Sequence, residues 1–287
     1  MRPLSDAELR SLASLLDDSD PGNLDLISRQ ILSVGEPILP YLDELRAQKT
    51  SEVVARAERL ARRVRFSGLK KDFTRLAASP APDLEEGAWL VCRFGYSTFS
   101  PDAYVQWLDR VAGKIREDSP PTPDAMFQKI NWLLFHHMGF AGNREDYYNP
   151  DNSYLHRVIE TRRGIPLSLS VLYLLVAKRV GLPVFGAGLP GHFMLGLRGA
   201  FGLRLLDVFG GGRLLDVGEA QRLLLRNGYE LKPQHLEPAT ARDMLLRMLR
   251  NLISIHQKTG DEDTEDMLSS LAEIFLTSGP PLLEPPR

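Results

Sequence analysis

The sequence predicts an α+β fold, in which one apolar helix packs on an antiparallel sheet and helical segments flank this core. Three observations support the prediction. After Gly164 an apolar run begins as a helix would and stops at the Gly-Leu-Pro breaker of residues 181–183. Three strand-like segments follow: one directly after this breaker, a second that is entered at His192, and a third that is closed by Asp207. The two ends of the chain instead carry apolar residues at helical spacing.

Residues 1–78 are predicted to form a helical unit. Ser5, followed three residues later by Glu8, is a capping-box signature, and leucines recur behind it at helical spacing. Breaks near residue 20 and at Gly35 separate this helix from two more, which resembles a HEAT-like unit without a second copy at a fixed period. A helical cap on the next domain is favoured over a separate binding module.

The segment at residues 66–78 is basic and shows no clear period, and the Ser-Pro-Ala-Pro run at 79–82 is the predicted domain boundary. Beyond it, apolar periodicity predicts three helices, at residues 84–94, 101–115 and 125–137. A polar loop with an aromatic pair follows at residues 139–155, and loops of this length tend to be functional.

From residue 154 to 212 the elements stand in the order that builds a Cys-His-Asp triad on a papain-like or transglutaminase-like core. This segment resembles the SirB1 family, a bacterial branch of the transglutaminase-like superfamily, in its G-I-P-L-S-L-S, L-P-G-H-F and D-V-F-G-G elements. The polar loop is similar to the same family. The resemblance implies a core domain at residues 79–235 and a tetratricopeptide-like helical pair at 236–278. The Pro-rich tail, residues 279–287, is predicted to be disordered.

The resemblance also implies where a nucleophile would stand. In catalytic relatives a Cys opens the helix about fifteen residues before the Gly that ends it, and counting back from Gly181 reaches Pro166. A proline also suits the first turn of a helix, because its missing N–H would be unpaired there. It has no acidic proton, so the predicted triad lacks its first member. Ser168 lies two residues further on and does not match the nucleophile position.

His192 and Asp207 are the predicted remainder of the triad, a vestigial catalytic pair whose carboxylate would hold the imidazole in one tautomer. This role rests mostly on the resemblance, since a core histidine bonded to a carbonyl and a turn residue at a strand end would also explain them. The glycines after Asp207 match no phosphate-binding motif and are predicted to permit a tight turn with positive φ. The candidate cleft-lining residues are Asn143, Asn152 and Ser168.

Composition excludes several classes of function. A net charge of −2 gives no electrostatic reason to expect nucleic acid, and no apolar run is long enough to span a membrane. The single cysteine, Cys92, rules out an internal disulfide and fits a reducing compartment, so a cytoplasmic protein is expected. No metal-binding motif occurs, and we expect neither a metal nor another cofactor.

Two classes of function remain open. We favour a catalytically inactive protein of the SirB1 family that binds a protein or peptide or acts in regulation, because the nucleophile of the triad is missing. The alternative is a hydrolase or acyltransferase that uses His192 and Asp207 with a water or serine nucleophile.

Overall fold

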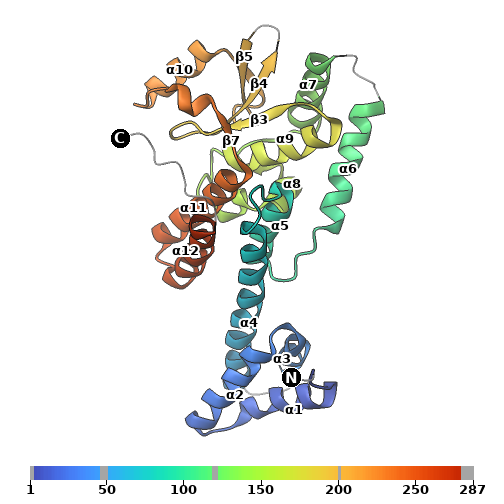
Figure 1. Cartoon of the computed structure of the whole chain (residues 1–287), viewed down its shortest axis with the longest axis vertical. Helices are drawn as coiled ribbons and strands as arrows, with labels where there is room; N and C mark the ends of the chain where they lie inside the picture. The colour runs from blue at the N-terminus through green and yellow to red at the C-terminus, as the bar shows by residue number, and fades with distance from the viewer. Residues whose placement is uncertain (1–2, 46–50, 118–121, 200–201, 279–287) are drawn as a thin grey trace. The chain divides into compact units, whose positions relative to one another are not determined.

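The computed structural model describes residues 3–45, 51–117, 122–199 and 202–278 (Figure 1). The tail at residues 279–287, which is predicted to be disordered, lies outside the described residues. The chain forms two compact units, Met1–Arg75 and Leu76–Arg287. Because the second unit combines helices with an antiparallel sheet, the predicted α+β fold class is confirmed.

Every regular element among the described residues of unit 1 is a helix. Its elements are α1 (Asp6–Ser14), the 3-10 turn η1 (Leu15–Asp17), α2 (Pro21–Val34), η2 (Glu36–Ile38), α3 (Leu39–Leu45) and the start of α4 (Ser51–Ala77). Ser5 caps α1, since its hydroxyl accepts from the Glu8 N–H while the Glu8 carboxylate accepts from the Ser5 N–H, which confirms the predicted capping box. The core of the unit is aliphatic and includes Leu16, Ile31, Ile38, Leu42, Leu60 and Val64.

The helix α4 continues through residues 66–77, where the sequence shows no clear period. Leu69, Phe73 and Leu76 are buried in this stretch, and their spacing of four and three residues places them on one helical face. The charged residues between them, such as Lys70 and Lys71, are exposed. The buried apolar face therefore stabilises this part of the helix. The basic residues around it obscure the helical period of the apolar residues in the sequence.

Unit 2 contains the remaining helices. They are α5 (Leu84–Gly95), α6 (Asp102–Glu117), α7 (Pro123–Asn131), a π-helix η3 (Trp132–His137), η4 (Pro150–Ser153), α8 (Leu155–Thr161), α9 (Pro166–Val180), α10 (Val217–Arg226), η5 (Pro233–Leu236), α11 (Ala241–Thr259) and α12 (Glu262–Thr277). The predicted helix at residues 125–137 is thus α-helical only to Asn131. The π-helix buries three consecutive residues, Leu133 to Phe135.

The main sheet of unit 2 has five antiparallel strands in the order β6-β5-β4-β3-β7. They are β3 (Val184–Ala187), β4 (Met194–Gly199), β5 (Gly202–Asp207), β6 (Arg213–Leu215) and β7 (Pro238–Ala239). Helix α10 packs on one face through Ala220 and Leu224, which share a core cluster with Met194 and Leu205. A second, parallel pair joins β1 (Ala141–Gly142) to β2 (Arg163–Gly164) and so ties the polar loop to the start of α9.

Helix α9 is the central element of unit 2. It contacts β3 and β4 of the sheet as well as α6, α7, α8 and α11 (Figure 1). Eleven of its fifteen residues are buried, which explains why its sequence is apolar on nearly every face. The helix ends at Gly181, whose φ of 73° gives the left-handed C-cap that glycine adopts without strain. The predicted helix from Pro166 to this glycine is confirmed.

Candidate functional site

The structure brings His192 and Asp207 together. His192 stands in the loop between β3 and β4, and Asp207 is the last residue of the neighbouring strand β5. The His192 Nε2 atom lies 3.1 Å from Asp207 Oδ1, a hydrogen-bond distance, and both side chains are mostly buried, with exposed fractions of 16% and 14%. Antiparallel pairing of β4 with β5 places the start of one strand beside the end of the other, which produces this contact.

The backbone around His192 is held by a residue from far along the chain. Arg247, on α11, donates hydrogen bonds to the carbonyl oxygens of His192 (2.7 Å) and Leu189 (3.2 Å). Its guanidinium also lies over the ring of Phe193, 5.4 Å from the centroid. Burial lowers the pKa of Arg247, yet arginine stays charged at neutral pH. Sequence reasoning assigns Arg247 no role in the site, because the contact joins residues more than fifty positions apart.

Gly191 shapes the turn that presents His192. Its φ of 65° lies in the left-handed region, and a Cβ at this position would lie 2.6 Å from the ring of Tyr229. Only glycine satisfies both constraints without strain. Backbone conformation and the nearby Tyr229 ring therefore explain why a glycine stands in the L-P-G-H-F element of the sequence.

Asp207 is positioned by the glycine turn that follows it. The Gly210 N–H donates to Asp207 Oδ1 at 3.0 Å, and a Cβ on Gly210 would lie only 2.5 Å from Oδ2. Gly211 and Gly212 have φ of 79° and 81°, so the predicted tight turn with positive φ is confirmed at these two residues. Burial acts to raise the pKa of Asp207. The hydrogen bond and charge interaction with His192 and the backbone N–H groups outweigh it, so the pKa is lowered.

The Asp207 carboxylate determines how the imidazole can act. An ionised carboxylate is only an acceptor, so the neutral ring is expected to carry its proton on Nε2 and donate it to Oδ1. The Nδ1 atom of His192 is then the basic ring nitrogen. A His–Asp pair in this state can accept a proton at Nδ1 and hold the resulting imidazolium beside a negative charge.

Phe209 connects this pair to the polar loop. Its ring centroid is 6.4 Å from that of His192 and 5.9 Å from that of Tyr147, and Arg144 lies over the ring at 5.0 Å. Gly142 on β1 is packed so tightly that a Cβ there would lie 2.4 Å from the Phe209 ring. The phenyl ring therefore contacts both the imidazole and the strand pair that leads into α9.

The hydroxyl groups of the serines at the start of α9 form hydrogen bonds with the backbone. Ser168 is 1% exposed, and its hydroxyl donates to the Asn152 carbonyl and accepts from the Ile165 N–H. The Ser170 hydroxyl donates to the Pro166 carbonyl at 2.8 Å. Ser168 thus supports the polar loop from inside and does not line a cleft.

The two candidate asparagines organise the polar loop. Asn152 is 3% exposed, and its side-chain amide donates to the carbonyls of Asp146 and Tyr147. Asn143 donates from Nδ2 to Asn152 Oδ1 at 3.0 Å and accepts from the Asp146 N–H. Both therefore fix the loop that carries Tyr147, and only Asn143 is partly exposed. The buried Asn152 therefore stabilises the loop, because its side-chain oxygen and nitrogen are both hydrogen-bonded within it.

A hollow of about 130 Å³ adjoins the pair on the Asp207 side. It is lined by Asp207, Arg213, Leu215, Glu219, Arg222, Leu223 and Arg226. Arg213 pairs with Glu219 at 3.5 Å, whereas Arg222 and Arg226 have no ion-pair partner among the residues that the structure describes. These two arginines stand four residues apart on α10, which places both on one face of the helix.

The described part of the chain offers no grouping of three or more His, Cys, Asp or Glu that could hold a metal ion. Among the described helices, none combines the length and apolar composition needed to cross a bilayer. Cys92 is buried in α5, and burial raises the pKa of its thiol to about 12.

An apolar helix packed on an antiparallel sheet whose neighbouring strands join a His to an Asp is an arrangement of transglutaminase-like proteins. Residues 102–250 match the transglutaminase-like superfamily, and they make up more than half of the chain. The chain therefore belongs to the transglutaminase-like superfamily.

Individual relatives share parts of this region. A UPF0162 protein of Xylella fastidiosa is 41% identical over 140 residues, which cover 47% of this chain and 50% of that protein. F-box only protein 21 of Mus musculus is 35% identical over 159 residues, 53% of this chain and 25% of that protein. A UPF0162 protein of Pseudomonas aeruginosa is 28% identical over 190 residues, 65% of this chain and 69% of that protein. The chain thus spans half or less of the length of the first two relatives. No solved structure matches.

Proposed function

We propose that this chain is a SirB1-type protein with Pro166 in the nucleophile position, and that it binds a protein or peptide segment without cysteine-dependent acyl transfer. The observation that carries the proposal is the start of α9, which opens at a buried Pro166. The pyrrolidine nitrogen is an amide nitrogen without a proton, so it cannot act as an activated nucleophile. His192 and Asp207 then form a hydrogen-bonded pair without a nucleophile to serve.

The other candidate nucleophiles do not fill this gap. Cys92 has a pKa raised to about 12 by burial, so its sulfur is a thiol rather than a reactive thiolate at neutral pH. The hydroxyls of Ser168 and Ser170 already donate to backbone carbonyls, whereas a nucleophilic serine must donate to a base. These observations support the loss of acyl transfer and leave the site available for binding.

Exposed aromatic residues beside the pair support a binding role. Tyr147 and Tyr148 are 39% and 57% exposed, and Tyr147 packs on Phe209, which contacts His192. Arg144 lies over the Phe209 ring, 5.0 Å from its centroid. Tyrosine and arginine are enriched at protein interfaces because each combines a large apolar body with a hydrogen-bonding group. We call Arg144, Tyr147, Tyr148 and Phe209 the aromatic patch and propose that it contacts the bound segment.

The alternative function is hydrolysis with His192 as a general base. A specific observation favours it: the Asp207 carboxylate bonds to Nε2, which leaves Nδ1 as the atom that could take a proton from water. A water nucleophile needs neither a thiol nor a serine hydroxyl. This alternative predicts turnover that depends on both His192 and Asp207.

Acyl chemistry is tested by comparing the wild type with Pro166→Cys and His192→Ala. The three assays are hydrolysis of p-nitrophenyl acetate, incorporation of dansylcadaverine into casein, and hydrolysis of peptide amides. We expect no turnover by the wild type. Pro166→Cys can place a thiol at the N-terminus of α9, where the helix dipole lowers a thiol pKa, and it is expected to gain slow esterase activity. The double variant Pro166→Cys/His192→Ala should lose that gain. Wild-type turnover that disappears in His192→Ala would refute the inactive assignment and support hydrolysis.

The binding role is tested by selecting a random peptide library displayed on phage against the immobilised full chain. Selected peptides should bind Tyr148→Ala at least tenfold more weakly than the wild type. Trp132→Ala is the matched control, because Trp132 is also a surface aromatic of unit 2, 49% exposed. A selection that yields no binder, or binders insensitive to Tyr148→Ala, would contradict binding at the aromatic patch.

A further inference from the structure

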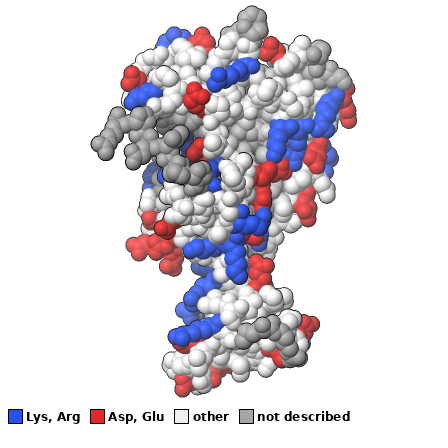
Figure 2. Space-filling model, in the orientation of Figure 1, with Lys and Arg blue, Asp and Glu red and all other residues white. Residues whose placement is uncertain are grey.

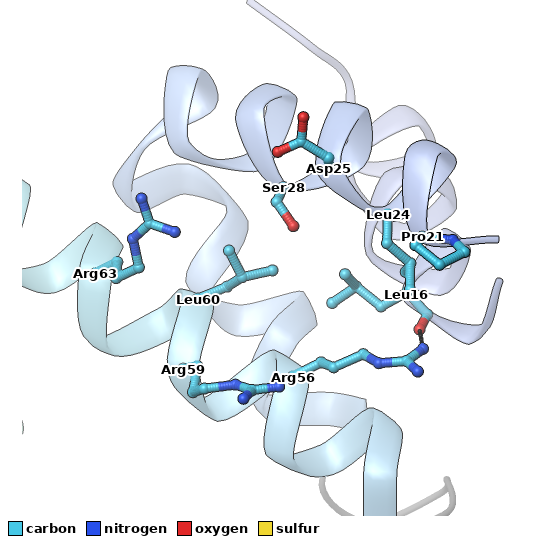
Figure 3. Close-up of a pocket in the computed structure, with 9 residues that line it drawn as sticks. All are labelled: Leu16, Pro21, Leu24, Asp25, Ser28, Arg56, Arg59, Leu60 and Arg63. Atoms are coloured by element: carbon cyan, nitrogen blue, oxygen red, sulfur yellow. Dashed lines mark hydrogen bonds between the residues drawn. The ribbon is translucent and has the colours of Figure 1, made fainter. Parts of the chain in front are cut away.

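Unit 1 contains a groove that lies outside the residues shared with the superfamily. It has a volume of about 370 Å³ and runs between α2 and α4 (Figure 3). Its lining residues are Leu16, Pro21, Leu24, Asp25, Ser28, Arg56, Arg59, Leu60 and Arg63. We call it the α2–α4 groove. Its volume falls in the range of about 300–1,000 Å³ that is usual for ligand sites.

The floor of the groove is aliphatic. Leu16 and Leu60 are buried, with exposed fractions of 1% and 5%, and Leu24 is half-buried beside them. Pro21, in the first turn of α2, also lines the groove. In Figure 3 the leucine side chains lie between the two helices. Such a floor favours an aliphatic side chain over a bare ion, because burying apolar surface stabilises a complex by about 25 cal/mol per Å².

The wall formed by α4 is cationic. Arg56, Arg59 and Arg63 follow at spacings of three and four residues, and Figure 3 shows them along α4 opposite the groove residues of α2. Arg56 is fixed, since it donates to the carbonyls of Leu16 (3.1 Å) and Asp18 (3.0 Å) and pairs with Glu52.

Arg59 and Arg63, in contrast, are exposed and have neither an ion pair nor a hydrogen bond among the described residues. The carboxylate that lines the groove, Asp25, is paired with Arg29 at 2.6 Å and lies on the α2 side. The helix as a whole carries eight Lys or Arg against three Asp or Glu, although the net charge of the chain is −2. Figure 2 shows Lys and Arg side chains grouped along α4. The groove therefore presents two unpaired guanidinium groups above an apolar floor.

We propose that the α2–α4 groove binds an acidic, leucine-bearing peptide segment of a partner protein. A leucine side chain would occupy the floor formed by Leu16, Leu24 and Leu60. Glutamate or aspartate side chains on either side of it would pair with Arg59 and Arg63, whose planar guanidinium groups bind carboxylates through two parallel hydrogen bonds. Nucleic acid fits less well, because the lining has no aromatic ring for base stacking and the aliphatic floor would stay unused.

The test measures fluorescence anisotropy of the full chain with a fluorescein-labelled peptide, Gly-Glu-Glu-Leu-Leu-Glu-Glu-Gly. We expect saturable binding that weakens with added salt, as carboxylate–arginine contacts require. Arg59→Glu/Arg63→Glu should raise Kd at least tenfold. The matched control is Arg62→Glu/Lys70→Glu, which makes the same change of charge at exposed positions of α4 outside the groove and should change Kd less than threefold. A peptide with serine in place of both leucines should bind at least fivefold more weakly.

Three results would overturn the proposal. The first is no saturable binding of the acidic peptide. The second is equal weakening in the groove variant and its matched control, which would reduce the interaction to general charge. The third is evidence for another occupant that disappears in Arg59→Glu/Arg63→Glu. Tighter binding of a single-stranded oligonucleotide would assign the groove to nucleic acid, and concentration-dependent dimerisation in sedimentation would assign it to a second copy of the chain. Circular dichroism should show unchanged folding, because Arg59 and Arg63 are exposed and have neither an ion pair nor a hydrogen bond among the described residues.

Discussion

Arg247→Met tests whether α11 holds the His192 loop in place. The substitution keeps an apolar stem of similar length but removes two hydrogen bonds to backbone carbonyls, at 2.7 Å from His192 and 3.2 Å from Leu189. Hydrogen bonds from a charged donor contribute roughly 1.5–3 kcal/mol each. Burial of the charged guanidinium, which lowers the Arg247 pKa, is itself unfavourable, and the variant no longer contains that charge. This gain offsets part of the lost hydrogen bonding, so we expect the free energy of unfolding to fall by about 2–3 kcal/mol.

Urea denaturation followed by tryptophan fluorescence measures this change, and amide hydrogen exchange locates it. Exchange should increase at residues 189–194, where the loop enters β4, and much less in α9. Arg250→Met is the control, because Arg250 lies on the same helix but is exposed, and it should cost less than about 0.5 kcal/mol. If Arg247→Met costs no more than Arg250→Met and leaves exchange near His192 unchanged, α11 does not position the loop.

Three further outcomes follow from contacts in unit 2. Buried Arg242 donates to the carbonyls of Phe275, Ala77 and Ser79, so Arg242→Met leaves three acceptors unpaired and should cost about 3–5 kcal/mol in urea unfolding. Gly191→Ala meets both a φ of 65° and the Tyr229 ring, and should lower Tm by about 3–8 °C in calorimetry. The folded pKa of Asp207 is lowered, so its carboxylate stabilises the protein above the unfolded pKa of about 4, and this contribution is lost as the pH falls through the folded value. Acid unfolding of Asp207→Asn should therefore be less steep below pH 4 than that of the wild type, and equal slopes would contradict the shift.

Local sequence patterns were sufficient for the fold class and for the order of the site elements. The apolar run from Pro166 and the glycine that ends it predict α9, because a proline at the first turn and a left-handed glycine after the last are constraints of the backbone itself. The glycines beside His192 and Asp207 likewise mark turns whose φ values are positive. Features of this kind depend on neighbours within a few residues, and a sequence displays them directly.

The tertiary structure alone decided which polar groups are free. Ser168 and Asn152, candidates for a cleft on the basis of sequence position, are buried and bonded to the backbone of the loop. Arg247, on α11, supports the backbone of the His192 loop, and Arg59 and Arg63 remain unpaired above an apolar floor. Whether a polar side chain is satisfied depends on atoms brought near it by packing of distant segments. Sequence spacing carries no record of those distances, so the chain by itself specifies its helices and turns while packing determines which of its charges and hydroxyls can bind.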